Sequence, residues 1–574
     1  MRTAAIVRVA VASLLAGRLS AQAPAIQIDS NLAVPMRDGV VLRADLWRPA
    51  GTAPTPVLVY RTPYDRKEAP SLAAKAVARG YAVLMQDARG RYMSDGEFEP
   101  YRHEADDGYD TIEWAARQPW SNGLVGTFGL SYPGAVQWLA ATRRPPSLKA
   151  MVPAMTYSTP ESFWYSGGVW DGSWLDWTWY NIAPDLRARR NEPGPTTDSA
   201  AAAVADTAMP RLRALPLAAL PDFKRIAPWY YEWMRHPPGD PWWRWAAVGD
   251  SYGGVTAGVL NLSGWFDEPY GPAGAVDNFS GLVTAGAAPR TGLIIGPWVH
   301  GVGATRSTKA GDRDFGPAAG IDYDGVVLDW LDRFLRPSDA AVAPPVRVFV
   351  MGANRWRDLA AWPPPGVRPD TLRLAAARAG SSIGGLVRPG TRGASRLASD
   401  PANPVADPYH GTAGAHDYRS LTGRKDVLTF ETAPLTAPVE IIGQVITELE
   451  LDASVPDWDI WMQLYDVAPD GTAWNLSGFG TALQRVSYRA GGPARQLVRR
   501  GETVPLRLTR MVTANRFLPG HRIRITLSGS FVPWFSRNLQ TGALEFDSTR
   551  TQAGSISVHH PRSLVILPVV PIGE

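Results

Sequence analysis

The stretch GLVGTFGLSYPGAVQWLAAT, from Gly123 to Thr142, places a serine between two different kinds of segment. The run LVGTFG before Ser131 is typical of a buried strand, and the run AVQWLAAT after it is typical of a helix. A strand, a tight turn that carries a serine and then a helix form a nucleophile elbow. The usual elbow pattern is G-x-S-x-G, and here Pro133 stands where the last glycine belongs.

A second stretch, GDSYGG from Gly249 to Gly254, matches the strict pattern. Its serine, Ser251, follows WWRWAAVGD, which is typical of a helix or a loop rather than a strand. The next strand begins almost at once, so there is no room for the helix that an elbow requires. We therefore predict that Ser131 is the nucleophile and that Ser251 lies in a loop turn.

Around Ser131, short apolar runs alternate with helical patterns, which indicates a parallel α/β sheet. The predicted strands include PVLVY, YAVLMQD and LKAMVPA, and the rhythm resumes at AGVLNLSGWFD and TGLIIGPWVHG. The sequence predicts an α/β-hydrolase core in two parts, residues 22–145 and 246–340.

Residues 146–245 interrupt this rhythm with a predicted helical cap, and ten of the 23 tryptophans lie between Trp164 and Trp245. Trp170, Trp174 and Trp177 have the i, i+4, i+7 spacing of one helix face. Core packing explains most of the ten, and a few are expected to line an aromatic substrate pocket. The candidates for substrate contact are Trp164, Trp170, Trp174 and Phe266.

After Pro344 the sequence changes to short alternating strands with many Gly and Pro turns, as in PVRVFVMG and HRIRITLSGS. Residues 341–574 are therefore predicted to form an all-β sandwich of jelly-roll type.

The first 21 residues resemble a secretory signal peptide, with Arg2 and Arg8, then the apolar run Val9 to Ala16, and small residues near Ala21. A frayed amphipathic helix is the alternative interpretation. A signal peptide predicts a secreted or periplasmic protein. No run of 18 apolar residues is present, so no membrane span is expected.

The composition excludes several classes of function. The chain has no cysteine, which rules out disulfides, thiol catalysis and cysteine-based zinc sites. A net charge of +4 over 574 residues, without a Lys/Arg run, argues against a nucleic-acid partner. No cofactor or metal is expected, and the sequence does not determine the oligomeric state.

A serine hydrolase needs a base to take the hydroxyl proton and a carboxylate to orient that base. In α/β-hydrolases these follow strands in the chain order Ser, Asp or Glu, His. Of the eight histidines, His300 alone follows a predicted α/β strand after an acid candidate. Asp267 ends the strand before it, which predicts a Ser131–Asp267–His300 triad.

With these residues in place, the chain resembles the CocE/NonD hydrolase family, typified by cocaine esterase. Related enzymes are X-prolyl dipeptidyl peptidases, α-amino-acid ester hydrolases and glutaryl-cephalosporin acylases. The resemblance covers nearly the whole chain after the predicted signal peptide. It rests on the motifs VPMRDGVVLRADLWRP, RTPYDR, DARGRYMSDGEF, WAARQPWSNGLVGTFGLSYPG, GWFD, GPWVHG, RVFVMGANRWRD and WPPP. In this family the elbow is G-x-S-Y-x-G, so Pro133 occupies a free position.

The resemblance implies that Tyr64, in RTPYDR, stabilises the oxyanion together with the backbone N–H of Tyr132. It implies hydrolysis of carboxylic esters or amides, of esterase or acylase type, through an acyl-enzyme. A competing class is a non-catalytic carbohydrate-binding protein that uses the sandwich, and the intact triad order argues against it.

Two further groups of polar and charged residues precede the elbow. Asp87, Arg89 and Ser94 are interpreted as residues that shape a loop beside it. The acidic residues from Glu104 to Asp110 open a helix, where they favour the helix dipole, and this is preferred to a metal site.

Relatives that act on free amines need carboxylates for the ammonium group. In α-amino-acid ester hydrolases part of that cluster follows the triad acid as D-x-E-D. Here those positions are Pro269 and Tyr270, and Glu268 stands one place early and is expected to point elsewhere. We therefore expect no requirement for a free amine. The alternative is an X-Pro dipeptidyl-peptidase-like or α-amino-acid ester hydrolase activity, served by carboxylates of the cap such as Asp171, Asp176 or Glu161.

Overall fold

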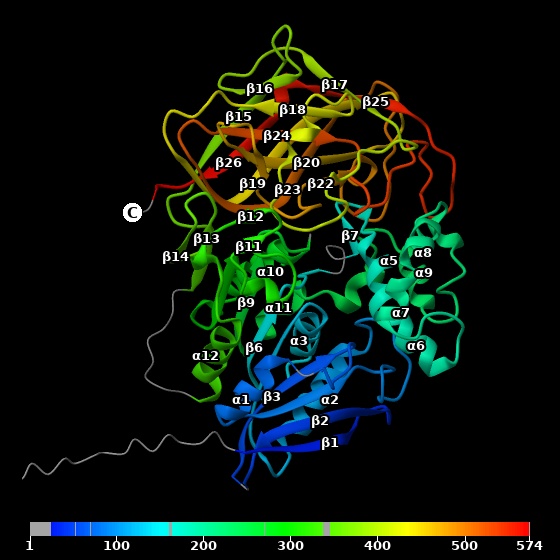
Figure 1. The fold of residues 1–574 in the computed structure, drawn as a ribbon, viewed down its shortest axis with the longest axis vertical. Helices are drawn as coiled ribbons and strands as arrows, with labels where there is room; N and C mark the ends of the chain where they lie inside the picture. Colours follow the sequence, from blue (N-terminus) through cyan, green and yellow to red (C-terminus); the bar gives the residue numbers. More distant parts are fainter. Residues whose placement is uncertain are drawn as a thin grey trace, which may run out of the picture.

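The computed structural model describes residues 25–572, apart from residues 52, 69, 160–163, 269 and 337–344. The predicted signal peptide, Glu161 and Pro269 lie outside the described residues. The molecule has three parts, which are visible in Figure 1: an α/β core, a helical cap beside it and a β-sandwich that packs on both.

The core is built on a ten-stranded sheet whose middle strands run parallel. Antiparallel strands flank them at both edges. Its strands, in spatial order, are β1 (Ile26–Pro35), β2 (Val41–Pro49), β4 (Ala82–Asp87), β3 (Thr55–Thr62), β5 (Ser121–Leu130), β6 (Leu148–Ala154), β9 (Gly258–Gly264), β10 (Thr291–Gly296), β13 (Val346–Val350) and β14 (Arg355–Leu359).

Both faces of this sheet are covered, which explains the nearly continuous apolar runs of its strands. Side chains alternate between the faces: Val57 and Val59 pack on one side of β3, and Leu58 packs on the other. Helices α1 (Ser71–Ala78) and α12 (Tyr323–Leu335) cover the Leu58 face. The opposite face carries α2 (Glu104–Ala116), α3 (Tyr132–Thr142) and α10 (Gly271–Thr284).

The core extends beyond the predicted boundaries. Strand β6 pairs with β5 and β9, although the sequence pattern places residues 146–154 in the predicted cap. Strands β13 and β14 extend the same sheet, although they lie in the segment predicted as sandwich. Local composition shows where strands lie, but only pairing shows to which sheet a strand belongs.

The cap occupies residues 164–254 and is mostly helical, in agreement with the sequence pattern (Figure 1). Its elements are β7 (Tyr165–Ser166), β8 (Val169–Trp170), α5 (Ser173–Trp177), the π-helical turn η1 (Thr178–Ile182), α6 (Ala183–Arg190), α7 (Asp198–Ala203), α8 (Ala205–Leu212), η2 (Leu217–Ala219), α9 (Pro228–Met234), η3 (Pro241–Ala246) and η4 (Gly249–Gly254).

The predicted helix face of three tryptophans is only partly formed. Trp174 and Trp177 lie on α5, but Trp170 lies in the short strand β8. The chain turns between them because the Asp171 carboxylate accepts a hydrogen bond from the Ser173 amide at 2.9 Å, which starts the helix after Trp170.

The C-terminal domain is an all-β sandwich, as predicted, and most of its strand pairs are antiparallel. Its strands are β15 (Arg368–Ala375), β16 (Ile383–Val387), β17 (Ala394–Ser399), β18 (Val427–Glu431), β19 (Val439–Ala453), β20 (Asp459–Val467), β21 (Ala473–Asn475), β22 (Leu483–Arg485), β23 (Val504–Phe517), β24 (Arg522–Ser528), β25 (Gly554–His559) and β26 (Leu564–Val569).

Short elements complete the fold: η5 (Ala288–Arg290), α11 (Val302–Thr305), β11 (Lys309–Ala310), β12 (Arg313–Asp314), η6 (Pro317–Ala319), η7 (Tyr418–Leu421), η8 (Val486–Tyr488) and η9 (His560–Arg562). In the described part of the chain, no helix has the length and apolar character needed to cross a membrane.

Candidate active site

Ser131 occupies the sharp turn between strand β5 and helix α3. Its backbone has φ 68° and ψ −125°, a conformation that is strained for a residue with a side chain. Two glycines make the turn sterically feasible. A Cβ on Gly129 would lie 2.5 Å from the Pro133 Cβ, and one on Gly134 would lie 2.6 Å from the carbonyl oxygen of Ala154. The glycine that the turn needs is therefore Gly134, and position 133 can be proline.

Ser251 has a different setting. It lies within η4, a short 3-10 helix that leads directly to strand β9. Its amide donates a hydrogen bond to the carbonyl of Val248, as in an ordinary helical turn. Ser251 is absent from the walls of the cavity described below.

His300 and Asp267 lie together just beyond the ends of β10 and β9. The His300 Nδ1 is 2.6 Å from an Asp267 carboxylate oxygen. The second oxygen of Asp267 accepts a hydrogen bond from the Ser263 hydroxyl at 2.7 Å, and the amide of Glu268 donates to the first at 2.8 Å. The Asp267 side chain is fully buried, so these contacts fix the orientation of the imidazole and leave its Nε2 free to face a substrate.

Opposing effects set the basicity of His300. Burial disfavours the charged imidazole, but the charge and the hydrogen bond of Asp267 favour it, and the charge of Glu268 adds to them. Their balance raises the pKa of His300 above its ordinary value. A base of raised pKa binds the serine proton more strongly during attack.

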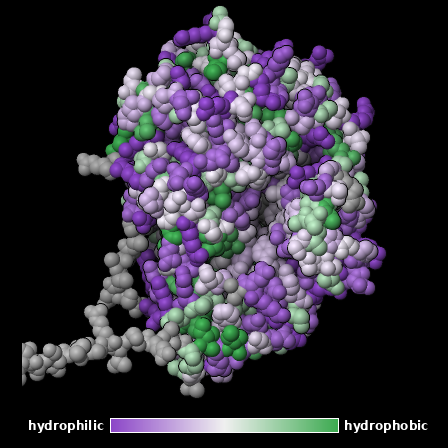
Figure 2. All heavy atoms as spheres, in the orientation of Figure 1, coloured by the Kyte–Doolittle hydropathy of each residue, from purple (hydrophilic) through white to green (hydrophobic). Residues whose placement is uncertain are grey.

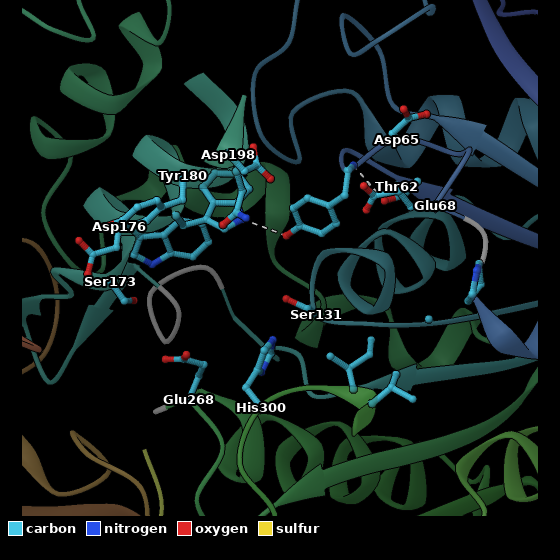
Figure 3. Close-up of a pocket in the computed structure, with 18 of the residues that line it drawn as sticks. Thr62, Asp65, Glu68, Ser131, Ser173, Asp176, Tyr180, Asp198, Glu268 and His300 are labelled. Carbon is cyan, nitrogen blue, oxygen red and sulfur yellow. Dashed lines mark hydrogen bonds between the residues drawn. The ribbon is translucent and has the colours of Figure 1, made fainter. Parts of the chain in front are cut away.

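Ser131 and His300 face one large cavity of about 870 Å³ (Figure 3). The space-filling view shows the surface hollowed where the cap meets the rest of the molecule (Figure 2). All three parts of the chain contribute to its walls: the core, the cap and, through His410, Gly411, Pro533 and Trp534, the sandwich.

Tyr64 also lines this cavity, two residues after strand β3. Its hydroxyl accepts a hydrogen bond from the indole Nε1 of Trp177 at 2.9 Å. Burial raises the pKa of Tyr64 above its ordinary value, and its contacts with Trp177 and Ser131 and the charge of Arg91 offset this only in part. Tyr64 is therefore protonated at neutral pH and can donate a hydrogen bond.

Tyr132 opens helix α3, and its side chain is turned into the core. The Tyr132 hydroxyl donates to the Glu104 carboxylate at 2.9 Å and accepts from the Tyr101 amide at 2.9 Å. Glu104 is in turn 2.6 Å from the guanidinium of Arg61. These contacts anchor the start of α3, where the first N–H groups have no partner within the helix.

The four residues predicted to contact substrate occupy different environments. Trp174 lines the cavity, whereas Trp164, Trp170 and Phe266 do not. Trp164 is completely buried, with its ring 4.2 Å from that of Trp170 and 4.4 Å from that of Trp233. Phe266 is also buried and packs on Phe315. Trp164 and Trp170 are core residues of the aromatic cluster in the cap, whereas Phe266 belongs to a separate core cluster that includes Phe315.

Trp177 and Tyr180 supply the aromatic cavity wall together with Trp174. From the sequence, Trp177 is one member of a predicted helix face and is not among the predicted substrate contacts. Its helical spacing from Trp174 was the signal available, but the spacing does not show which members of the face are covered by neighbours.

Carboxylates are more frequent on the cavity wall than expected. Glu268 points into the cavity, in contrast to the prediction that it points elsewhere (Figure 3). One of its carboxylate oxygens is buried and lacks a hydrogen-bond partner among the described residues. Burial raises the pKa of Glu268, His300 lowers it and Asp267 raises it again, with a net increase.

Two acids of the cap lie near Glu268. Asp176 lines the cavity and pairs with Arg213 at 2.7 Å. Asp171 is buried outside the cavity wall. Burial, reinforced by the charge of Glu268, raises the pKa of Asp171 to about 8.

The motif from Asp87 to Gly96 forms a network of hydrogen bonds and ion pairs beside the site. Asp87 pairs with Arg66, Arg89 with Asp107, and the Ser94 hydroxyl donates to the carbonyl of Asp87. No group of three or more metal-ligating side chains is found in the described part of the chain.

Comparison with known proteins identifies the family. The chain is 33% identical over 582 residues to cocaine esterase of Rhodococcus sp. (strain MB1 Bresler), with 95% of this chain and 98% of the relative covered. This chain belongs to the CocE/NonD hydrolase family. Family models match the chain as well: X-Pro dipeptidyl-peptidase (S15 family) over residues 38–302, and the X-Pro dipeptidyl-peptidase C-terminal non-catalytic domain over residues 339–564.

Solved structures show the same fold. An aminopeptidase from a marine sediment Thaumarchaeota archaeon superposes with a TM-score of 0.80 at 23% identity, covering 96% of this chain and 97% of that one. An α-amino acid ester hydrolase superposes with a TM-score of 0.78 at 24% identity, covering 97% and 100%. As a CocE/NonD member, the chain is a hydrolase with an α/β domain and a C-terminal β-sandwich.

Proposed function

We propose that this CocE/NonD hydrolase cleaves carboxylic esters through an acyl-enzyme formed on Ser131. The observation that carries the proposal is the shared cavity: a serine on a strained turn faces the same space as an imidazole held by a buried carboxylate. These are the three groups that acyl transfer needs: a nucleophile, a base and an acid that orients the base.

In the acylation step the Ser131 oxygen attacks the ester carbonyl carbon, and His300 Nε2 takes the hydroxyl proton. The carbonyl electron pair moves to oxygen, which becomes an oxyanion. The hydroxyl of Tyr64 and the N–H of Tyr132 donate hydrogen bonds to this oxygen. As the carbonyl re-forms, the bond to the alkoxy oxygen breaks, and that oxygen receives the proton from His300.

Deacylation repeats the sequence with water. Water attacks the acyl carbon and gives one proton to His300, a second oxyanion forms at the same two donors, and the Ser131 oxygen leaves with the proton from His300. The products are a carboxylic acid and an alcohol. An amide follows the same steps, with an amine as leaving group, so acylase activity is included in the proposal.

The cavity favours substrates with an apolar or aromatic group. Trp174 and Trp177 contribute aromatic surface to its cap wall, and Trp534 contributes aromatic surface to its sandwich wall. Burial of apolar substrate surface against such walls stabilises the complex by about 25 cal/mol per Å². A small aryl ester meets these walls and still brings its carbonyl to Ser131.

A fluorophosphonate probe tests the proposal, because it phosphonylates an activated serine. We expect one adduct, on Ser131 by peptide mass spectrometry, with loss of p-nitrophenyl butyrate hydrolysis in proportion to labelling. Absence of labelling, or labelling of Ser251, would contradict the proposal.

A second candidate, hydrolysis of substrates with a free amine, is favoured by one observation: the unpaired Glu268 carboxylate oxygen inside the cavity. An ammonium group of the substrate would neutralise Glu268 and complete its hydrogen bonding. Asp176 lies on the same wall but already pairs with Arg213.

The two candidates differ in measurable specificity. Rates for p-nitrophenyl acetate and butyrate are compared with those for an aminoacyl ester and an X-Pro anilide at equal concentration. A preference for amine-bearing substrates that is lost in Glu268→Gln would establish the second candidate. Equal rates in Glu268→Gln and wild type for all four substrates would exclude it.

We also propose export of the protein to the periplasm or the medium, on the basis of the predicted signal peptide at residues 1–21. N-terminal sequencing of the protein from its native host should show a mature chain that starts near Gln22. A chain that begins at Met1 would contradict export by cleavage.

A further inference from the structure

Trp177 connects the cap to the candidate oxyanion hole. It is the last residue of α5, and its indole nitrogen lies 2.9 Å from the hydroxyl oxygen of Tyr64. An indole N–H can donate a hydrogen bond but cannot accept one. In this pair Tyr64 is therefore the acceptor, and its own proton is directed elsewhere.

The direction of that proton decides whether Tyr64 can stabilise an oxyanion. A serine or a carboxylate in place of Trp177 could accept the phenolic proton and withdraw it from the substrate. Trp177 can only donate a hydrogen bond, so it cannot accept the phenolic proton of Tyr64 and draw it away from the substrate. The hydroxyl of Tyr64 lies on the wall of the cavity, and Ser131 lies beside it.

Trp177 also packs against the residue that carries the second donor. Its ring is stacked on that of Tyr132, with a centroid distance of 6.2 Å and an interplanar angle of 12°. The rings of Tyr64 and Tyr132 meet edge to face at 6.3 Å. One cap residue thus contacts both residues of the candidate oxyanion hole.

Arg91 provides a second link between the same two regions. Its side chain is fully buried, and its guanidinium donates to the carbonyl of Pro63, next to Tyr64, at 2.8 Å. It also donates to the carbonyls of Asn181 and Ile182 in the cap, at 2.9 and 2.7 Å. Arg91 therefore links the backbone that precedes Tyr64 to a cap segment, and that segment is close in sequence to Trp177.

We propose that Trp177 is a positioning residue that aims the Tyr64 hydroxyl at the oxyanion, so that the cap completes the oxyanion hole built by the core. The inference rests on the proposed role of Tyr64 in acyl transfer. It gives the cap a part in the chemical step in addition to its part in substrate binding.

The decisive variant is Trp177→Phe, which removes the indole N–H and keeps an aromatic ring on Tyr132. The matched control is Trp229→Phe, because the Trp229 ring packs 6.2 Å from that of Trp177 and its buried indole nitrogen has no hydrogen-bond partner in the described structure. We expect kcat for p-nitrophenyl butyrate to fall about tenfold in Trp177→Phe, as for the loss of one hydrogen bond. KM should stay within about twofold, and the control should stay near wild type.

A double-mutant cycle with Tyr64→Phe separates positioning from packing. Once the Tyr64 hydroxyl is absent, Trp177→Phe should reduce kcat by less than about twofold further. A full tenfold loss in that background, or no loss in the wild-type background, would overturn the proposal. Replacement of Trp177 by 3-benzothienylalanine, which has the shape of tryptophan without the N–H, should reproduce the tenfold loss of kcat. This variant replaces Trp177→Phe in the experiment if Trp177→Phe does not fold.

Two further variants distinguish failure of the proposed function from failure of this inference. If Ser131→Ala or Tyr64→Phe retains wild-type kcat, the acyl-transfer mechanism is wrong and this inference is wrong with it. If both variants lose activity while the benzothienylalanine variant does not, the mechanism stands and only the role of Trp177 is wrong.

Discussion

The catalytic edge of the core and the aromatic cluster of the cap border the same cavity, but different kinds of interaction position their side chains. Ser131, Asp267 and His300 each follow one strand of the same sheet, namely β5, β9 and β10. Parallel strands bring their carboxyl ends to one edge, so residues distant in sequence converge there. No comparable rule orders the cap, where Trp164 and Trp170 are buried and Trp174 and Trp177 reach the cavity.

The difference shows how far a local pattern determines a position. The pairing of strand β5 with β3 and β6 fixes where β5 ends at the edge of the sheet. Ser131 directly follows the end of β5, so its position at this edge is set to within one turn of the chain. In the cap, each aromatic ring is placed by the rings around it, as Trp164 is by Trp170, Trp174 and Trp233. Substitutions at the two regions should therefore have different consequences.

The largest effect is expected at the catalytic edge. Ser131→Ala removes the nucleophile and should lower kcat for p-nitrophenyl butyrate by at least about 10⁴-fold, with little change in thermal stability. Steady-state kinetics at matched concentrations of folded protein measure it. Ser251→Ala is the matched control and should be indistinguishable from wild type, and a large loss in the control would contradict the assignment of the elbow.

Loss of an oxyanion donor should be the next largest effect. Tyr64→Phe keeps the ring and removes the hydroxyl, so kcat should fall about 10²–10³-fold. Binding of a boronic acid that forms a tetrahedral adduct should weaken by a similar factor, because the adduct resembles the transition state. Unchanged boronate affinity would show that Tyr64 does not contact the oxyanion.

A substitution in the buried part of the cap should affect stability rather than chemistry. Trp164→Ala leaves a large void among aromatic rings and should reduce the free energy of unfolding by about 3–5 kcal/mol. Denaturant unfolding measures the loss, and kcat per fluorophosphonate-reactive site should remain near wild type. If kcat falls by more than about tenfold per reactive site, the buried cluster and the catalytic edge are less separate than the structure indicates.

The smallest effect is a shift in pH dependence. Since the charge of Glu268 raises the pKa of His300, Glu268→Gln should lower that pKa. His300 acts as a base when it is neutral, so the acid limb of kcat/KM should move to lower pH by less than about one pH unit. The pH profile for an uncharged ester measures this, and a shift to higher pH would contradict the electrostatic assignment.

Particular residues show where sequence reasoning was sufficient and where it was not. The strand–serine–helix pattern and the positions of Gly129 and Gly134 predicted the elbow, and the chain order predicted which histidine and acid would meet. The assignment of Glu268 was wrong because a residue beside the triad acid can turn in either direction after a strand ends. The boundary at residue 145 was wrong because β6 joins the core through its partners β5 and β9.

The sequence by itself determined the fold class and the family and predicted a triad in the expected order, because strand periodicity, turn glycines and chain order are properties of the chain. Only the tertiary structure decided which aromatic side chains face the cavity and that the sandwich forms part of its wall. It alone showed that Trp177 donates to Tyr64. These contacts join residues from the core, the cap and the sandwich, and their geometry depends on how those parts pack rather than on any local pattern.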